Sequence, residues 1–295
     1  MISSMTGFAS GKGQAGAHSW SWELRSVNAK GQDIRIRVPD WITGLEAHLR
    51  KSVSEASARG NITIGLRLSR EEGEATLALN HVQLDAVLSA MAETEQRAMD
   101  AGLSLAPSTA SQILALRGIL EADVESDDPA PLLSALKADF KPVLEAFLEM
   151  RAEEGAALEK VLTGQLDEID TLTQAAARAA AARDDESGAA LRAALARVSD
   201  VVDVDETRIA QEIALLAVKS DITEEIDRLK AHVAAARELL AKGGPVGRKL
   251  DFLSQEFNRE ANTLCAKSQN ADLTSIGLEL KAVIDRMREQ IQNVE

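Results

Sequence analysis

Cysteine is almost missing from this sequence, in which Cys265 is the single thiol among 295 residues. One thiol cannot form a disulfide within the chain, and this fits a protein of the reducing cytoplasm. Cys265 lies beside a helical apolar stripe, where a buried, unreactive thiol is favoured over a nucleophile. We therefore expect neither a disulfide framework nor thiol chemistry.

Aromatic residues are also scarce, at 3% of the chain, and tyrosine is absent. Hydrophobic residues as a whole reach 45%, and alanine is abundant. This composition suits long packed helices better than a β-sandwich. Apolar runs long enough to span a bilayer are missing, and the opening residues, MISSMTGFAS, lack the basic and apolar segments of a signal peptide. We therefore expect a cytoplasmic protein that does not use a membrane.

Positive charge is in the minority, and the formal net charge is −14. That balance argues against a global attraction to nucleic acid or anionic lipid. The acidic residues are concentrated between residues 140 and 230, whereas the first 70 residues carry Arg25, Lys30, Arg35, Arg37, Arg50, Lys51, Arg59, Arg67 and Arg70. The sequence therefore allows a local positive surface at its N-terminal end.

Residues 1–80 predict a small α+β module with one helix and a mainly antiparallel sheet. Polar and apolar residues alternate over residues 20–27, 32–38 and 62–68, which is the period of a strand. Residues 28–31 form a predicted turn, residues 42–58 a predicted helix, and residues 76–80 a possible further strand. The polar strand faces, which include Arg25, indicate either cross-strand ion pairs or a surface that contacts phosphate.

Residues 81–204 predict a mostly helical, coiled-coil-like region. Helices are expected over residues 81–101 and 111–122, and a long apolar pattern runs from about Pro131 to Leu172. We expect a break or kink just before Pro142, a second break over residues 183–188 and a new helix from Ala189. Gly155, in a polar patch that begins at Arg151, indicates a close helix contact or a kink.

Residues 205–295 predict a C-terminal helical domain that contains a hairpin. Residues 205–242 form either one helix or two helices joined at residues 219–221, with Ser220 as the N-cap. The Gly243–Gly247 segment breaks the pattern, and the helix after it, residues 247–268, can fold back on the one before.

Each of the two hairpin helices carries an unusual row of polar residues. Spacings of three and four place Asp221, Glu225, Arg228 and His232 on one row, and Glu256, Glu260, Thr263 and Lys267 on the other. A solvated face with ion pairs would give the same pattern, and an isolated histidine is more often a packed or surface residue than a ligand.

Antiparallel packing of these helices would bring the two rows together. Carboxylates with a histidine suit Mg²⁺ or Mn²⁺, which can activate water and stabilise the charge that develops on a phosphate. Arg228, Arg259 and Lys267 could hold a phosphodiester. The combination is not specific by itself, and dinucleotide, P-loop, zinc-protease and serine-hydrolase signatures are absent.

Longer runs of sequence resemble a known family. They are MISSMTGFAS, ELRSVNAKGQD, MRAEEGAALEK, SDITEEIDRLKAHV, GRKLDFLSQEFNREANTLCAKS and ELKAVIDRMREQIQNVE. Together they resemble the YicC (YicC/YloC) family of bacterial proteins over both ends and part of the middle. The resemblance implies a cytoplasmic, divalent-metal-dependent endoribonuclease that cuts single-stranded RNA and assembles as a helix-rich homo-hexamer.

The resemblance also marks signature positions. They correspond here to Arg25, Asn28, Glu224, Glu225, Arg228, His232, Asp251, Gln255, Glu256, Asn258, Arg259, Glu260, Asn262 and Lys267. The chain departs from the commoner family pattern at Ala29-Lys30-Gly31, where an aromatic residue is missing, and at Asn61, where a basic residue is missing. Base stacking at the first of these turns is therefore in doubt.

We therefore predict a metal-dependent endoribonuclease acting on single-stranded RNA. Catalytic roles are assigned to Glu224, Glu225, His232, Glu256 and Glu260, and metal binding by Mn²⁺ or Mg²⁺ to Glu225, His232, Glu256 and Glu260. RNA contacts are assigned to Arg25, Asn28, Arg228, Arg259, Asn262 and Lys267. The alternative is a non-catalytic RNA-binding or scaffold oligomer whose polar rows are interface salt bridges, and a weaker one is a helical adaptor.

Overall fold

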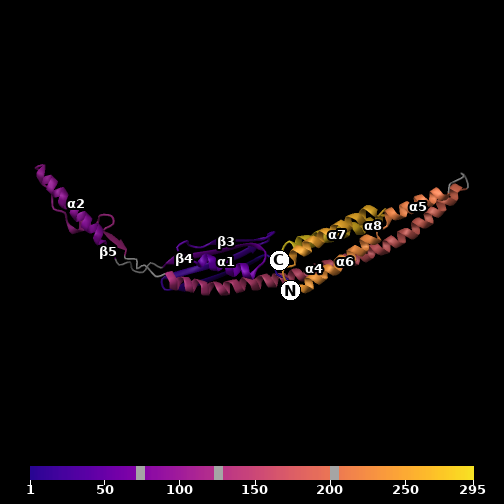
Figure 1. Ribbon diagram of the computed structural model, residues 1–295, viewed down its shortest axis with the longest axis horizontal. Helices are drawn as coiled ribbons and strands as arrows, with labels where there is room; N and C mark the ends of the chain where they lie inside the picture. The colour runs from indigo at the N-terminus through magenta and orange to yellow at the C-terminus, as the bar shows by residue number, and fades with distance from the viewer. Residues whose placement is uncertain (71–76, 123–128, 200–205) are drawn as a thin grey trace. The chain divides into compact units, whose positions relative to one another are not determined.

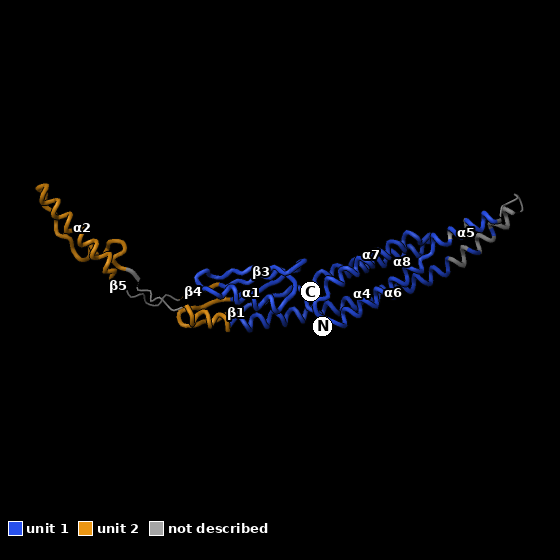
Figure 2. The backbone as a smooth tube through the Cα atoms, viewed as in Figure 1, with its two compact units in different colours: residues 1–11, 22–66, 139–295 blue, residues 12–21, 67–138 orange. Residues whose placement is uncertain are grey.

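The computed structural model describes residues 1–70, 77–122, 129–199 and 206–295, and its elements are shown in Figure 1. The chain divides into two compact units (Figure 2). The first contains residues 1–11, 22–66 and 139–295, and the second contains residues 12–21 and 67–138. In the described part of the chain, no helix has both the length and the apolar character needed to cross a membrane. The predicted α+β class is confirmed.

The main sheet has four strands in the order β1-β2-β4-β3. These are β1 (Gly7–Ala15), β2 (His18–Val27), β3 (Gln32–Arg37) and β4 (Gly60–Arg70). The prediction of a mainly antiparallel sheet missed that β3 pairs with β4 in parallel, with Ile34 opposite Ile62. The connection between them contains helix α1 (Leu45–Ala56), and a crossover of that length permits parallel pairing. β4 therefore separates β2 from β3.

Helix α4 (Pro129–Ser199) runs for 71 residues and continues through Pro142, so of the break or kink predicted just before this residue the break does not occur. A proline inside a helix costs about 3 kcal/mol. Phe140, Val143 and Phe147 are buried on either side of it, and Phe140 packs on Trp22 of β2 with 5.2 Å between ring centroids. Burying one such side chain is worth roughly 1.5–3 kcal/mol, so this packing outweighs the loss.

The break predicted over residues 183–188 is also wrong, because α4 continues through it. Arg183 is buried, and its guanidinium donates to the carbonyl oxygens of Ser268 at 3.0 Å and Ser220 at 2.9 Å. Those carbonyls lie where two other helices end, and a cation there is stabilising. The first residue of the run that suggested a break therefore ties three helices together.

The C-terminal part of the first unit is a bundle formed by α4 and three further helices, with α5 (Glu206–Ser220) leading into it. These are α6 (Thr223–Lys242), α7 (Gly247–Lys267) and α8 (Ala271–Ile291). Of the two alternatives for residues 205–242, the structure has two helices joined near residues 219–221, and the predicted break at 243–247 is confirmed. Ser220 is not an N-cap, because its hydroxyl donates back to Ala217 and Asp221 accepts the Thr223 N–H instead.

A continuous apolar core holds the bundle together. Leu162 and Ile169 of α4 meet Leu229 and Val233 of α6 in it, and every one of these side chains is buried. From α7 and α8 the core receives Leu250, Phe257, Ala261, Leu264, Leu280, Val283 and Ile284. The predicted apolar stripe of residues 247–268 is thus the buried face of α7, and the polar row runs along the edge of that face, where Glu260 is itself buried.

A buried ion pair joins segments that are far apart in sequence. Arg151 of α4 is 1% exposed, and its guanidinium lies 3.1 Å from the Glu295 carboxylate and donates to the Ser4 carbonyl at 2.6 Å. The same carboxylate accepts the backbone N–H groups of Ala58 and Arg59. Burial lowers the pKa of Arg151, and the Glu295 charge opposes that shift. This ion pair connects α4, the chain ends and the start of β4.

Gly155, one turn after Arg151, marks a close contact, as expected, but the neighbour is not another helix. A β-carbon at this position would collide with the backbone of Ile2 and Ser3. Ser4 donates its N–H to the Arg151 carbonyl at 2.9 Å and bridges to Val294. The polar patch at Arg151 therefore anchors residues 2–5 against α4.

The second unit contains its own small elements. Helix α2 (His81–Asp100) agrees with the prediction, whereas the helix predicted over residues 111–122 ends early, at Leu114 of α3 (Ala110–Leu114). Its last residues form β6 (Leu120–Ala122), which pairs antiparallel with β5 (Leu77–Leu79) in a separate sheet. The possible strand at residues 76–80 therefore joins β6 rather than the main sheet, with Thr76 outside the described residues.

Candidate active site

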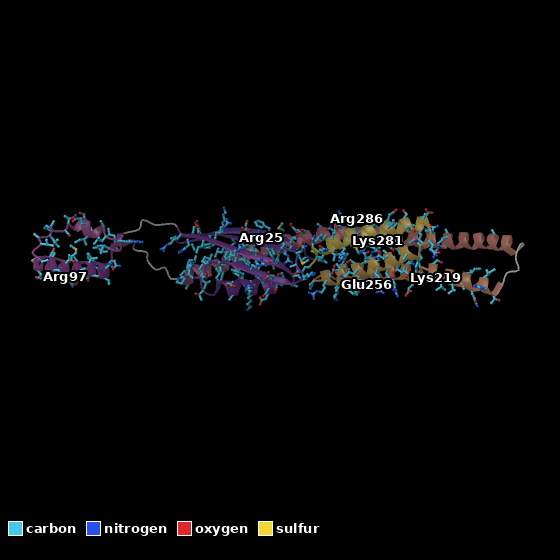
Figure 3. The ribbon with its side chains drawn as sticks, turned by 90° about the horizontal axis from the view of Figure 1, so that it is seen from above. Arg25, Arg97, Lys219, Glu256, Lys281 and Arg286 are labelled. Carbon is cyan, nitrogen blue, oxygen red and sulfur yellow. The ribbon has the colours of Figure 1, made fainter. Side chains whose placement is uncertain are left out.

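The polar rows of α6 and α7 face one another across the hairpin. His232 of α6 and the pair Glu256 and Glu260 of α7 offer ligand atoms that all lie within 4.8 Å of one another. The two glutamates are one helical turn apart, so both carboxylates reach the same side of α7. Figure 3 shows Glu256 on this helix. The three side chains form the only such group of potential metal ligands in the described part of the chain.

The surroundings of this group differ from one side to the other. Glu260 is 3% exposed, whereas the Glu256 side chain is 28% exposed and opens toward solvent. The His232 ring packs edge-on against Phe257, with 5.6 Å between centroids, and Phe257 is fully buried. The packing fixes the ring between a buried carboxylate, Glu260, and a partly exposed one, Glu256.

One ring nitrogen of His232 has no partner. Nε2 is buried, and it makes no hydrogen bond with any described residue. Buried polar atoms normally have a hydrogen-bond partner, so a buried ring nitrogen without one beside two carboxylates indicates a site for a ligand. A divalent cation accepts histidine nitrogen and carboxylate oxygen together. The donor set therefore fits such an ion.

Arg228 supplies the positive charge nearest to Glu260. Its guanidinium lies 3.3 Å from the Glu260 carboxylate and also pairs with Glu224, one turn earlier on α6. The hydrogen bond to Glu260 and the charge of Glu224 raise the pKa of Arg228. Glu224 is exposed and lies outside the group of three, so the structure links it to the group through Arg228.

Glu225 also lies outside the group of three. Its carboxylate is 2.9 Å from the Lys267 ammonium, and its other oxygen, Oε2, is buried without a hydrogen-bond partner among the described residues. The hydrogen bond that the Lys267 ammonium donates to Glu225 Oε1 raises the pKa of Lys267. Lys267 also donates to the Asp221 carbonyl at 3.0 Å, and the Thr223 N–H lowers the pKa of the Asp221 carboxyl. Of the four predicted metal ligands, the structure brings three together and places Glu225 against a lysine.

The remaining predicted residues lie around the group or away from it. Arg259 is 70% exposed, with its guanidinium 4.0 Å from Glu256, and Asn262 is exposed one turn from Asn258. Elsewhere on α7, Gln255 bonds Asp251 and Asn258 bonds Asp285 of α8. Arg25 lies on β2, apart from Glu256 in Figure 3, and Asn28 follows the end of that strand; both are exposed.

Two buried arginines that hold the chain segments of the first unit together were not among the predicted site residues. Arg183 binds the carbonyl of Lys267 at 3.3 Å as well as that of Ser268, so it holds the end of α7 beside Glu225. Arg151 anchors the chain segments at the start of the bundle. No local signal in the sequence indicated that either side chain is buried, because each arginine stands at the start of a polar run, Arg151 before Glu153 and Glu154 and Arg183 before residues 184–187.

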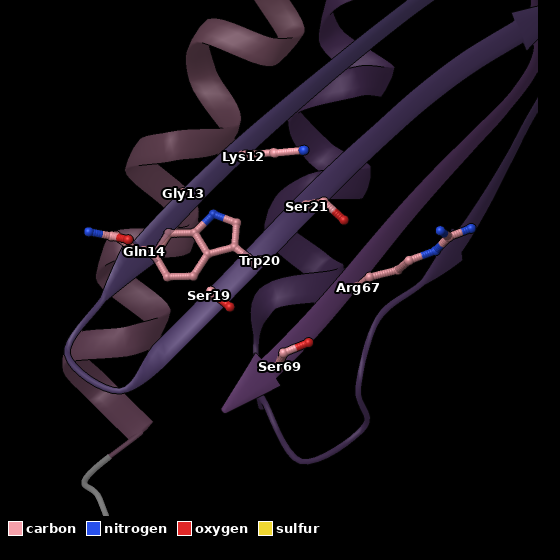
Figure 4. Close-up of a pocket in the computed structure, with 8 residues that line it drawn as sticks. All are labelled: Lys12, Gly13, Gln14, Ser19, Trp20, Ser21, Arg67 and Ser69. Carbon is pink, nitrogen blue, oxygen red and sulfur yellow. The ribbon is translucent and has the colours of Figure 1, made fainter. Parts of the chain in front are cut away.

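A separate cavity of about 570 Å³ lies in the second unit (Figure 4). It is lined by Lys12, Gly13, Gln14, Ser19, Trp20, Ser21, Arg67 and Ser69. Neither a histidine nor a carboxylate contributes to this lining, so the cavity does not offer the ligands that Mn²⁺ or Mg²⁺ prefers. It shares no residue with the group on α6 and α7.

Comparison with known proteins covers the whole length of the chain. The family model for the N-terminal region of YicC-like endoribonucleases matches residues 2–160, and the model for their C-terminal part matches residues 167–295. The chain is 36% identical over 297 residues to a probable endoribonuclease YicC of Haemophilus influenzae. It is 29% identical over 299 residues to a probable endoribonuclease YicC of Clostridioides difficile. Both alignments cover 100% of each chain.

Proposed function

Because the chain belongs to the YicC-like endoribonuclease family, we propose that it cleaves single-stranded RNA with a divalent cation held by His232, Glu256 and Glu260. The observation that carries this proposal is the convergence of these three side chains within 4.8 Å around a buried ring nitrogen that lacks a partner. Mn²⁺ and Mg²⁺ are the ions that this donor set suits.

The ion, when bound, would supply positive charge for the phosphate and a water of lowered pKa. Arg259 is the cation best placed to contact a phosphodiester, because its guanidinium is exposed beside Glu256. Asn262 lies about one turn after Arg259 on α7, and Lys267 lies between one and two turns further on. Glu224 and Glu225 are the candidate acid–base groups on α6, and both are held by cations, Arg228 and Lys267.

Arg25 and Asn28 extend the proposed RNA contacts onto the sheet. Both are exposed, and the structure gives neither side chain an ion pair or hydrogen bond among the residues it describes. A cation at such a position can follow the phosphate backbone without reading its sequence. The proposed RNA is therefore held at two places, the helix hairpin and the sheet.

We propose a homo-hexamer in the cytoplasm as the working form. Phe252 on α7 and Leu278 on α8 are large apolar side chains that are 61% and 58% exposed. Both side chains would be available for contacts between copies, and phenylalanine is enriched in protein interfaces. The competing scaffold function would use the polar rows as salt bridges between copies, but Arg228 and Lys267 already have carboxylate partners within the chain.

Removal of divalent ions is expected to stop cleavage of a single-stranded RNA, because the ion supplies the charge stabilisation. A gel assay with purified protein, with EDTA, and with Mn²⁺ or Mg²⁺ restored after EDTA makes the comparison. We expect a loss of at least about 100-fold with EDTA and recovery with metal. Cleavage at the untreated rate in EDTA would contradict the metal proposal and leave RNA cleavage itself standing.

A further inference from the structure

Glu260 has two cationic partners in this account, because it is a proposed ligand of the metal ion and also forms an ion pair with Arg228. We infer that Arg228 competes with the metal ion for Glu260. Arg228 pairs with Glu260 until the ion binds, and its guanidinium is then released toward the RNA phosphate. This inference rests on the proposed function, because it assumes that an ion binds at His232, Glu256 and Glu260. It assigns Arg228 a positioning role that links metal binding to substrate binding.

Burial explains why Glu260 needs a counter-ion. Its side chain is 3% exposed, and an ionised carboxylate that is buried without a partner is costly. Arg228 provides that partner at 3.3 Å, from one turn before His232 on the same helix. Without metal, the arginine therefore does for Glu260 what the ion would do when bound.

A divalent ion beside Glu260 would oppose this pairing. Two cations near one carboxylate repel one another, and the repulsion is strong where solvent is excluded. Arg228 has a second partner in Glu224, whose side chain is 65% exposed, and Arg228 itself is 48% exposed. The guanidinium can therefore leave Glu260 and stay on Glu224, which places it nearer to solvent.

Release would put the guanidinium where a phosphate can use it. The planar fork of arginine matches phosphate oxygens, and a guanidinium that no longer neutralises Glu260 is free to bind one. Coupling of this kind is reciprocal. If bound metal raises the affinity for RNA by a given factor, bound RNA raises the affinity for metal by the same factor, because it draws Arg228 away from Glu260. Metal and RNA would then assemble together at the hairpin.

The decisive experiment measures Mn²⁺ affinity without RNA, from the loss of the free Mn²⁺ signal in electron paramagnetic resonance. The protein is compared with Arg228→Gln, Arg237→Gln and Glu260→Gln. Arg237 is the matched control, because it lies on the same helix, is similarly exposed and pairs with Asp167 at 2.7 Å outside the site. Far-ultraviolet circular dichroism establishes that each variant is folded.

We expect Arg228→Gln to tighten Mn²⁺ binding by about 10-fold, within the usual range for coupling between two sites. Arg237→Gln should leave the affinity unchanged, although it removes the same charge, and Glu260→Gln should weaken it. Unchanged or weaker binding in Arg228→Gln, with Glu260→Gln still impaired, overturns the competition and leaves the metal site standing. Absence of Mn²⁺ binding in both the unmodified protein and Arg228→Gln overturns the inference and the metal part of the proposed function together.

Discussion

Replacing Glu256 and Glu260 together by glutamine is expected to lower the rate of RNA cleavage by about 10³-fold or more. The substitutions keep side-chain size but remove two of the three converging ligands, which leaves His232 alone. A bound metal contributes several kcal/mol of transition-state stabilisation, and each 1.4 kcal/mol is a factor of ten in rate. The measurement is a single-turnover cleavage assay with saturating Mn²⁺.

The control replaces two carboxylates that are exposed on the same bundle. Glu238 of α6 and Glu289 of α8 lie outside the group of ligands, so their joint change to glutamine removes the same charge without touching the site. That variant should cleave within about twofold of the unmodified protein, since surface substitutions have small effects. A folded Glu256→Gln, Glu260→Gln variant that cleaves at the control rate would exclude these residues from catalysis.

Replacing Arg151 by leucine is expected to lower the free energy of unfolding by about 3–5 kcal/mol. The change removes the cation that faces Glu295 and the donor to the Ser4 carbonyl, while the carboxylate stays largely buried. Removing one partner of a buried ion pair costs this much because the other charge is left uncompensated. Urea unfolding followed by circular dichroism at fixed protein concentration measures the loss.

An exposed ion pair provides the comparison for Arg151. Arg286 of α8, labelled in Figure 3, pairs with Glu168 of α4 at 3.2 Å, and both side chains are more than half exposed. Its change to glutamine should cost less than about 1 kcal/mol. Equal losses in the two variants would show that the Arg151 pair does not hold the chain segments together.

The hairpin that carries the candidate site could be predicted from sequence because its signals are local. The apolar period of Leu250, Phe257 and Leu264 defines one face of α7, and Gly243 to Gly247 defines the turn. A helix of known face joined by a short turn to another helix of known face has few ways to pack. The approach of His232 to Glu256 and Glu260 follows from those constraints.

Pairings between distant segments could not be predicted in the same way. A strand's period states which face is buried, and it does not state that β4 lies between β2 and β3. Pro142 and Arg183 carried local signals for a break, and tertiary contacts outweighed both: packing of Phe140 for one, carbonyl acceptors for the other. Local propensity is a weak prior where burial is extensive.

The sequence also could not predict which charged residues form ion pairs with one another. The rows predicted that Glu225, Arg228, Glu260 and Lys267 lie near one another, but sequence spacing cannot say which cation takes which carboxylate. The structure pairs Arg228 with Glu260 and Lys267 with Glu225. That choice separates Glu225 from the group of three and creates the competition inferred for Arg228.

The most direct test of the central claim is a crystal structure of the protein soaked with Mn²⁺, with anomalous scattering used to locate the ion. We expect an anomalous peak within about 2–2.5 Å of His232 Nε2 and of carboxylate oxygens from Glu256 and Glu260. A peak elsewhere with these three side chains unligated, in protein that cleaves RNA with Mn²⁺, would contradict the account.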